Sequence, residues 1–390
     1  MSRPRLSALS VGAVSDLPRD AWTAATPDDF FFDLRFLRVM EESRVEDAAY
    51  RYVLMFEDEE PVGAAVLSHF LLRLDLLSGD PWVRRVRRIA PQLLDVPIIC
   101  CGIPASFGQH HLHVTRPRLL PVAATVVHGR MEEWARETRS SLLLWKEWSP
   151  TQRMAQRAKA LGYVVLPTLP DHTVGPLPPS VEEFLGSMRS PYRRKFRRAA
   201  ELMAPGPAAR RGDVELAIST FGRDDVASFF RGYAAVLNRT EVRLEAYPLK
   251  FFSNLAESDL ELEILELSNR VRGERIAALV IPSGDTLCFI LVAKEHSRYH
   301  DSLYPLLLQC IVLHAIQSDF RCVRLGQTSS YSKVSVGAEP RRLETFIRAS
   351  APVKHRLLER FGPLFFPEVT SPELRVFRNT PHENGVSGED

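Results

Sequence analysis

The stretch LELEILELSNRVRGERIAALVIPSGDTLCFILVAKE, residues 260–295, decides the fold class. Its first two apolar runs lie on either side of a polar turn at Asn269–Glu274, and a further apolar run begins at Thr286. Short runs of this kind, bounded by Asn, Gly and Pro, are typical of β-strands. The stretch therefore predicts a β-hairpin followed by another strand.

The residues that follow continue the pattern with a helix and more strands. Residues 305–319, PLLLQCIVLHAIQSD, carry no charge before Asp319 and predict a largely buried helix. After it come the predicted strand CVRLGQT, a short polar turn or helix SSYSKVSVG, and the predicted strand RLETFIR. The second half of the chain thus predicts a hairpin, a loop, a helix and then a strand.

The first half repeats this order with different residues. Residues 51–70 predict a hairpin around the acidic turn Glu57–Glu60, and the short apolar run PIICC follows. A helix is predicted near Leu119–Thr138, and the next strand is SLLLWKEW. A second helix, with Ser149 as N-cap and Pro150 at its first position, ends at Gly162 before the strand YVVLP.

Two copies of one pattern predict a duplicated α/β protein, and 390 residues are enough for two cores. We expect two consecutive sheets, each mixed and mostly antiparallel with flanking helices, that meet at a cleft. The proline-rich segment LPTLPDHTVGPLPPS is the best linker candidate. The predicted division is an N-terminal domain 1–170, a linker 171–180, a C-terminal domain 181–370 and a flexible tail 371–390.

Composition excludes several classes of protein. Apolar residues make up 45% and charged residues 25%, and 50 basic against 48 acidic groups give a net charge of +2, so bulk charge demands no nucleic acid or membrane partner. The five cysteines fit neither a disulfide framework nor a CxxC metal site and are expected as buried thiols. Without a secretory signal or a long apolar run, the expected location is the cytoplasm.

The segment SPYRRKFRRAAELM, residues 190–203, concentrates positive charge on a predicted helix. Its apolar residues recur at spacings of three and four, and this leaves five cations among residues 193–198 on the flanks. Phosphate is a natural partner for such a cluster, so Arg193, Arg194 and Lys195 are candidate phosphate-binding residues. A solvated helix face is the plainer alternative, and RNA binding is a further one.

The loop before the buried helix is another candidate anion site, because the amides of a helix N-terminus point at it. Arg298 and Tyr299 are the candidates there. No glycine lies between Gly284 and Gly326, which argues against a glycine-rich pyrophosphate turn of the usual coenzyme A type. We expect no metal site: His110, His111 and His113 have no partner ligands at a suitable spacing, and Cys100 and Cys101 lie in a buried run without a base.

The segment LGQTSSYSKVSVGAEPRRLETFIR, residues 325–348, resembles the C-terminal signature of Fem-like acyltransferases. In that signature a strand ending near G-Q-T leads to a tyrosine or phenylalanine and a lysine, then a G-A pair and a final strand. The stretch FLGSMRSPYRRKFRRA, the hairpin EDEEPVGAAVL and the strand LLLWKEW also resemble elements of the family. The matching residues of the signature are Gly326, Gln327, Thr328, Tyr331 or Ser332, Lys333, Gly337 and Ala338.

The resemblance implies a tandem GNAT fold and transfer of an acyl or aminoacyl group. The donor would be a CoA thioester or an aminoacyl-tRNA, with no tightly bound cofactor. The acceptor would be a small-molecule or peptide amine from a cell-envelope or natural-product pathway. Lys333 would supply positive charge at the reacting centre, Gln327, Thr328 and Tyr331 would orient the acceptor, and Glu147 is the candidate base. The alternative is a non-catalytic GNAT-fold module that binds a phosphate-bearing ligand.

Overall fold

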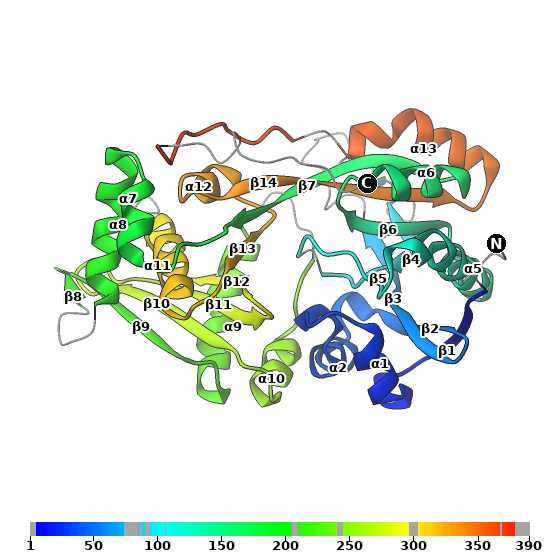
Figure 1. The fold of residues 1–390 in the computed structure, drawn as a ribbon, viewed down its shortest axis with the longest axis horizontal. Helices are drawn as coiled ribbons and strands as arrows, with labels where there is room; N and C mark the ends of the chain where they lie inside the picture. The colour runs from blue at the N-terminus through cyan, green and yellow to red at the C-terminus, as the bar shows by residue number, and fades with distance from the viewer. Residues whose placement is uncertain are drawn as a thin grey trace.

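The computed structural model describes residues 5–73, 85, 88–89, 94–105, 107–204, 210–211, 213–239, 245–295, 303–366 and 369–378. Within these residues the chain forms a 14-stranded sheet with helices on both faces. The molecule is elongated, with the first half of the chain at one end and most of the second half at the other (Figure 1).

Within the described residues, the first half contains seven strands, four α-helices and four 3₁₀ turns. The strands are β1 (Ser7–Val11), β2 (Ala49–Glu57), β3 (Glu60–Arg73), β4 (Asp95–Cys101), β5 (Leu112–Val114), β6 (Leu142–Trp148) and β7 (Val164–Val174). The helices are α1 (Arg19–Ala25), α2 (Leu34–Ser43), α5 (Leu120–Thr138) and α6 (Gln152–Ala160), with 3₁₀ turns η1 (Val14–Asp16), η2 (Phe30–Phe32), η3 (Val45–Asp47) and η5 (Pro117–Leu119).

The second half begins with the helix pair α7 and α8. Its helices are α7 (Val181–Ser187), α8 (Ser190–Met203), α9 (Arg223–Leu237), α10 (Leu249–Glu257), α11 (Leu303–Gln317), α12 (Ser330–Val334) and α13 (Pro352–Phe365). Its strands are β8 (Arg210–Arg211), β9 (Val214–Thr220), β10 (Glu263–Asn269), β11 (Glu274–Ser283), β12 (Thr286–Lys294), β13 (Cys322–Gly326) and β14 (Glu339–Ala349).

The predicted repeat of elements is confirmed, but the prediction of two separate sheets is wrong. The hydrogen-bonded order is β1-β2-β3-β4-β6-β14-β7-β13-β12-β11-β10-β9-β8, and β5 pairs with β3. All neighbours pair antiparallel except β4 with β6 and β12 with β13. One ladder therefore runs through both halves, because β7 and β14 cross between them (Figure 1).

Each of these two strands completes the sheet of the other half. The last residues of β14, Glu344–Ala349, insert between β6 and the beginning of β7 in the first half. The last residues of β7, His172–Val174, insert between β13 and the beginning of β14 in the second half. An exchange of this kind removes an exposed edge from each half and fixes the two halves together.

The exchange corrects the predicted linker, since Asp171–Val174 belong to β7. Pro170 is tolerated in this strand because it lies at a register shift between the Arg341 and Leu343 pairings, where the ladder is irregular. The predicted tail is also shorter, because Val376 is buried and the amide of Arg189 donates to its carbonyl at 2.9 Å. Residues 379–390 lie outside the described part.

The start of α6 differs from the predicted position by two residues, whereas α8 spans the predicted residues 190–203. Thr151, rather than Ser149, caps α6, and its hydroxyl accepts from the amide of Met154. In α8 the helix includes Ser190, and no side chain caps its N-terminus. Pro191 then occupies the first turn of α8, where its missing N–H costs nothing.

Three hydrophobic clusters hold the layers together. One face of the first half packs against α5 and α6, and one face of the second half packs against α8 and α11. The third cluster is common to both halves: it joins Phe31 and Phe36 of the first half to Phe251 and Phe252 of the second. The halves therefore share a core as well as strands.

The exchange predicts that a residue near the end of the chain stabilises the first half. Phe346 of β14 is fully buried beside Trp148, with ring centroids 6.3 Å apart. Phe346→Ala should lower the free energy of unfolding by about 3–5 kcal/mol. All five tryptophans precede residue 150, so denaturant unfolding followed by tryptophan fluorescence reports on the first half.

Phe361→Ala, at an exposed position of α13, is the matched control and should change stability by less than about 1 kcal/mol. An unchanged tryptophan transition in Phe346→Ala would mean that β14 contributes little to the first half.

Candidate active site

The second half opens where its two parallel strands part. β12 pairs with β13 at Thr286, Leu287 and Cys288 only, although β12 continues to Lys294. A register shift on the other edge of β12 leaves Ile290 without a partner in β11, which bends the strand. A cavity of about 470 Å³ lies at this fork.

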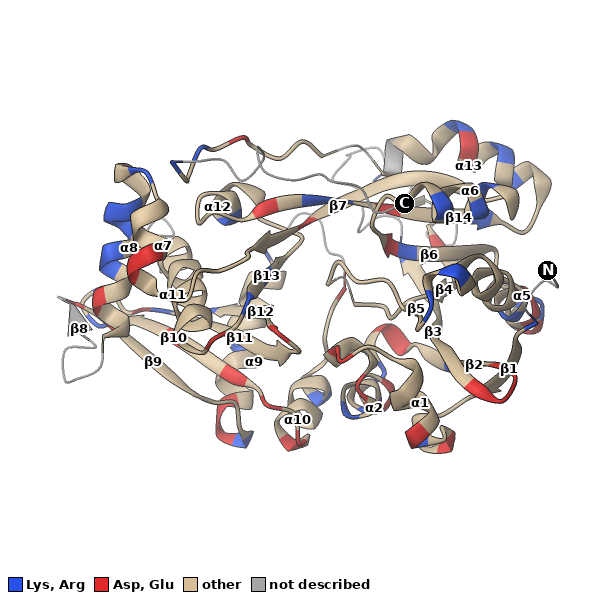
Figure 2. Cartoon of the chain, in the orientation of Figure 1, with Lys and Arg blue, Asp and Glu red and all other residues tan. Residues whose placement is uncertain are grey.

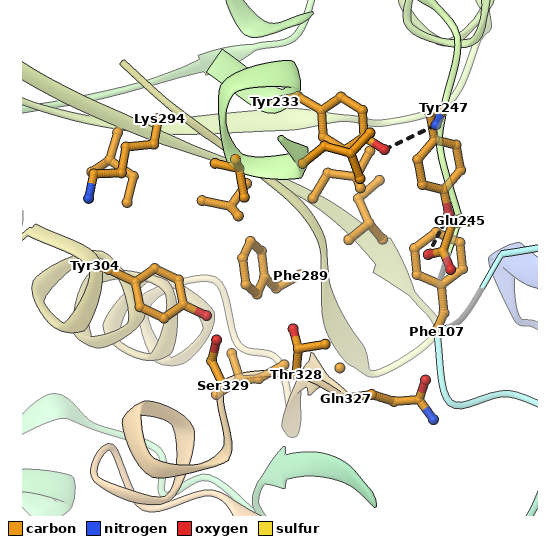
Figure 3. A pocket seen from close by; sticks show the side chains of 18 of the residues that line it. Phe107, Tyr233, Glu245, Tyr247, Phe289, Lys294, Tyr304, Gln327, Thr328 and Ser329 are labelled. Atoms are coloured by element: carbon orange, nitrogen blue, oxygen red, sulfur yellow. Dashed lines mark hydrogen bonds between the residues drawn. The ribbon is translucent and has the colours of Figure 1, made fainter. Parts of the chain in front are cut away.

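The walls of the cavity come from several elements (Figure 3). Thr328 and Ser329, which follow β13, lie on one side and Tyr233 and Tyr247 on the other, with Phe289 of β12 between them. Phe107, from the loop after β4, is the contribution of the first half. The cavity is thus mainly apolar and lies where the two halves meet.

One carboxylate projects into this cavity beside the aromatic wall. The hydroxyl of Tyr247 donates to Oε1 of Glu245 at 3.3 Å, and the amide of Tyr247 donates to the hydroxyl of Tyr233 at 3.0 Å (Figure 3). These bonds orient Tyr247 between its two neighbours. A carboxylate in an apolar cavity is suited to binding a cation.

Lys333 of α12 is the buried cation of the site. It lines the cavity with only 2% of its surface exposed, and its Nζ lies 3.8 Å from where a Cβ on Gly326 would be. Burial lowers the pKa of Lys333 to about 7, and the charge of Asp171 opposes part of that shift. Its ammonium therefore loses a proton near neutral pH, unlike that of a surface lysine.

The other residues of the signature lie around Lys333 in different ways. Gln327 lines the cavity, but its Nε2 donates to the carbonyl of Leu169 at 2.8 Å, so the side chain also ties β13 to β7. Thr328 lines the cavity. Tyr331 is 67% exposed and is not among the lining residues, because it lies on the outer side of the short helix α12.

A buried ionic cluster joins this site to the strand crossing. Asp171 is fully buried in β7, and its Oδ2 accepts from Nε of Arg324 at 2.8 Å and from Arg341 at 3.3 Å. Arg324 of β13 also donates to the carbonyl of Gly108 and, at 2.9 Å, to Oε1 of Gln109. The cluster therefore fixes the loop that carries Phe107.

Gly108 has φ of +75°, and a Cβ there would lie 2.9 Å from the Cβ of Asp171. The left-handed backbone and the close approach both require glycine at this position.

The equivalent fork of the first half is filled by that same loop. β4 and β6 pair in parallel as far as Cys101 and Trp145, and the next residue, Lys146, donates to the carbonyl of Ala105 at 2.6 Å. Glu147 is buried and accepts from the amide of Gln109 at 3.0 Å. Burial raises the pKa of Glu147, while Lys146 opposes the shift.

Glu147 is therefore separate from Lys333 and does not line the cavity. We infer that it positions the loop.

The predicted phosphate-binding residues lie outside the site. Arg193, Arg194 and Lys195 are on α8, whose buried side packs on α11, and none lines the cavity (Figure 2). Arg298 and Tyr299 lie outside the described residues.

Sequence reasoning missed Phe107, Glu245 and Tyr247 of the cavity and the ion pair of Asp171 with Arg324. A charged residue inside an apolar strand, as Arg324 is in CVRLG, was the available signal for the last of these.

Cys100, His110 and His111 are not among the residues that line the cavity. Burial raises the pKa of Cys100 to about 12 and lowers the pKa values of His110 and His111 to about 4 and about 3. In the described ranges, no cluster of three His, Cys, Asp or Glu residues is arranged to hold a metal ion. Nor does that part of the chain contain a helix with the length and apolarity needed to span a bilayer.

Comparison with known proteins identifies the fold. A family model described as an acetyltransferase (GNAT) domain matches residues 186–334, which run from α7 to α12 and include the fork. The solved structure titled FemX has a TM-score of 0.56 at 12% identity, over 90% of this chain and 100% of that one. The chain has the Fem-like tandem GNAT fold.

A second solved structure, a tandem GNAT protein from the clavulanic acid biosynthesis pathway, has the same fold. Its TM-score is 0.51 at 12% identity, over 89% of this chain and 99% of that one. No curated protein sequence matches this chain. At these identities the structural likeness concerns the fold, whereas the GNAT domain supports transferase activity in general.

The burial of Lys333 predicts a pH-dependent effect on stability. The folded protein binds fewer protons than the unfolded chain between the lowered pKa of about 7 and the ordinary value of 10.5, so stability rises with pH across this window. Lys333→Met should therefore stabilise the protein at pH 7 by about 1–3 kcal/mol. The gain should shrink as the pH approaches 10.

Urea unfolding at several pH values measures this gain. Lys354→Met, at an exposed position, should show no such dependence. A stability difference for Lys333→Met that stays constant from pH 7 to 10 would contradict the buried, weakened base.

Proposed function

We propose that this protein transfers an acyl or aminoacyl group from a CoA thioester or an aminoacyl-tRNA to the amine of a small molecule or peptide. The observation that supports the proposal most strongly is the cavity at the fork of β12 and β13, with buried Lys333 in its lining. The donor and the acceptor meet at this fork, at the junction of the two halves.

The fork suits the acyl end of the donor. Past Cys288 the edge of β12 no longer pairs with β13, so its backbone groups are available to an extended chain. Phe289 and Ile290 line the cavity there and provide apolar contact. Amides of β12 near the bulge at Ile290 are candidates to stabilise the oxyanion that forms when the acyl carbonyl is attacked.

The acceptor amine enters as an ammonium ion, and the carboxylate of Glu245 binds it. Glu245 is held by Tyr247 on the wall that also contains Phe107, so it is placed at the junction with the first half. The filled fork of the first half leaves that half to shape the acceptor side of the site. This arrangement favours a single transfer centre in the second half.

Lys333 accepts the proton that the acceptor must lose. With its pKa lowered to about 7, a large share of Lys333 is neutral at physiological pH and can act as a base. The amine nitrogen then attacks the acyl carbonyl, the new C–N bond forms, and the bond from carbon to sulfur or to the ribose oxygen breaks. The nitrogen loses its second proton as the amide forms, and this proton passes to the leaving thiolate or alkoxide, while Lys333 releases the first proton to water before the next turnover.

The base role predicts a particular pattern among variants of Lys333. Lys333→Met should lower kcat/KM about 10²–10⁴-fold because the base is lost. Lys333→Arg keeps the charge but stays protonated, so it should be nearly as slow. In the parent protein kcat/KM should rise with pH through about 7, and neither variant should show that rise.

Transfer assays with both donor classes, followed by mass spectrometry of the acylated amine, provide the measurement. Exposed Lys250→Met on α10 is the control and should retain full activity. Full activity in Lys333→Met would exclude Lys333 from the chemistry, and activity retained by Lys333→Arg alone would assign it charge stabilisation instead.

Glu245 predicts a different kinetic signature. Glu245→Gln keeps the size and the hydrogen-bonding capacity of the side chain but removes the charge that attracts the ammonium. The KM for the acceptor should rise about tenfold or more, with a smaller change in kcat and no change in the KM for the donor. Equal KM values for the acceptor in the two proteins would remove Glu245 from acceptor binding.

The pathway and the donor are separable by experiment. An acceptor from cell-envelope or natural-product synthesis is consistent with the amine chemistry, and a panel of such amines tests it. Ribonuclease treatment abolishes transfer if an aminoacyl-tRNA is the donor and leaves it unchanged if the donor is a CoA thioester. The reaction requires no tightly bound cofactor in either case.

A further inference from the structure

A second large cavity lies in the first half. It shares no lining residue with the cavity at the fork. Its volume is about 480 Å³, and it is lined by the end of α5, the start of β6, the end of β14 and the start of α13. Nothing in the transfer reaction uses it. Its lining residues share a strongly cationic character, with Arg136, Arg139, Arg348 and Lys354 against a single carboxylate, Glu132.

The one carboxylate is already neutralised. Glu132 accepts a hydrogen bond from Arg348 at 2.6 Å, so the opposite charges of these two residues neutralise each other. Arg136 and Arg139 form no ion pair with any residue whose placement is described, and Lys354 donates to the hydroxyl of Ser141 at 3.1 Å. Among the described residues none of these three cations has a carboxylate within salt-bridge distance, although Arg136 helps to lower the pKa values of Glu132 and Glu137. The lining of the cavity therefore keeps an excess of positive charge.

The first turn of α13 adds to the attraction for an anion. This helix has 14 residues and begins with Pro352 beside the cavity, where Ser350, Ala351 and Lys354 are lining residues. The helix therefore begins at the edge of the cavity, where the helix dipole favours an anion. Phosphate is the anion whose charge and acceptor oxygens match arginine and serine donors together.

The same helix carries an unusual apolar stripe on its outer side. Val353, Leu357 and Phe361 are spaced four residues apart, so they lie along one face, and they are 70%, 52% and 42% exposed. The opposite face packs inward: Gly362 is buried against Leu166 of β7.

Lysine and arginine border the stripe on both sides. Lys354 lies on one side, and Arg356 and Arg360 on the other, with the Arg360 guanidinium 5.8 Å from the ring centroid of Phe361. In Figure 2 α13 lies at the outer edge of the molecule with basic segments along it.

We propose that α13 and the cavity beside it dock on an anionic phospholipid surface. The cavity formed by Arg136, Arg139 and Lys354 takes a lipid phosphate, while Val353, Leu357 and Phe361 enter the boundary between headgroups and acyl chains. A helix that lies in the interface plane needs an apolar face with long cationic side chains beside it, because these reach back to the phosphates. The cavity supplies positive charge for the lipid phosphate, and the stripe supplies apolar side chains for the boundary with the acyl chains.

A protein partner fits the same features less well. One row of three side chains is much smaller than the roughly 20–30 residues a side of a standard protein interface. A fluid surface of negative charge requires no matching shape. Lysine and arginine near it each contribute favourably until salt screens them.

Vesicle co-sedimentation tests the proposal with the full-length protein. We expect binding to vesicles of phosphatidylglycerol mixed with phosphatidylcholine, and little binding to pure phosphatidylcholine. Arg136→Glu combined with Arg139→Glu should weaken binding about tenfold or more, because two favourable charges become unfavourable ones. Leu357→Asp, which places a charge in the stripe, should weaken it to a similar degree.

Two matched controls carry the same changes elsewhere on the surface. Arg197→Glu with Arg198→Glu reverses two exposed charges on α8, and Val271→Asp changes an apolar residue that is 74% exposed in the β10–β11 turn. Both should bind vesicles like the parent protein. Unchanged tryptophan-monitored unfolding shows that the α13 and α5 variants are folded.

Other outcomes overturn the proposal in identifiable ways. Absence of binding to anionic vesicles, or binding that survives both sets of α5 and α13 changes, rejects the surface. Stabilisation by inorganic phosphate that Arg136→Glu with Arg139→Glu abolishes, without vesicle binding, assigns the cavity to a free phosphate compound. Self-association in sedimentation velocity that Leu357→Asp abolishes, without vesicle binding, assigns the stripe to a second copy of the chain.

Discussion

The buried carboxylate of Asp171 is the interaction on which the rest of the structure depends. It lies in β7 where that strand passes between β13 and β14, and it accepts from Arg324 of β13 and Arg341 of β14. Removing one partner of a buried ion pair costs about 3–5 kcal/mol, since the remaining charge is left without compensation. Asp171 therefore holds together the crossing of the two exchanged strands.

The same carboxylate links the crossing to the chemistry. Its charge favours the protonated form of Lys333, while burial disfavours it, and the balance places the pKa of Lys333 near neutrality. Arg324 connects Asp171 to the loop at Gly108 and Gln109, which carries Phe107 to the wall of the cavity. The pKa of Lys333 and the shape of the cavity thus both depend on Asp171, Arg324 and their neighbours.

Each half contains a fork where two parallel strands part, and the two forks differ in what fills them. In the second half, β12 and β13 diverge after three pairs and leave a cavity. In the first half, the carbonyl of Ala105 accepts from Lys146 and the amide of Gln109 donates to Glu147, so the loop fills the equivalent space. Two side chains with opposite charges, Lys146 and Glu147, thus hold the loop in that fork.

Most of the fold was predictable because each element has its own periodic pattern. The hairpins, the buried helix α11 and the order of elements along each half follow from residues close together in the sequence. The exchange of β7 and β14 was not predictable in the same way, because it depends on pairing between residues 164–174 and 339–349. The prolines of β7 even favoured a linker, since nothing local shows that Pro170 sits at an irregularity of the ladder.

The residues of the site also differ in whether the nearby sequence reveals them. Gln327, Thr328 and Lys333 lie in one short segment, and the structure places all three in the lining of one cavity. Glu147 looked like a base because it is a charged residue at the end of a buried strand, but its partner is a loop amide 38 residues away. Glu245 and Phe107 gave no sequence signal, since their roles arise only when the halves pack together.

The near balance of 50 basic and 48 acidic residues conceals how differently the cations are used. On α8 the apolar residues Phe196, Ala199 and Leu202 all face inward, so its cations stand on a uniformly polar outer face that water can solvate. On α13 the cations border exposed apolar side chains, which water solvates poorly. A patch that combines unpaired charge with exposed apolar area is stabilised most by a surface that offers both anions and hydrocarbon. For this reason α13, rather than the more highly charged α8, is the part of the molecule suited to a lipid surface.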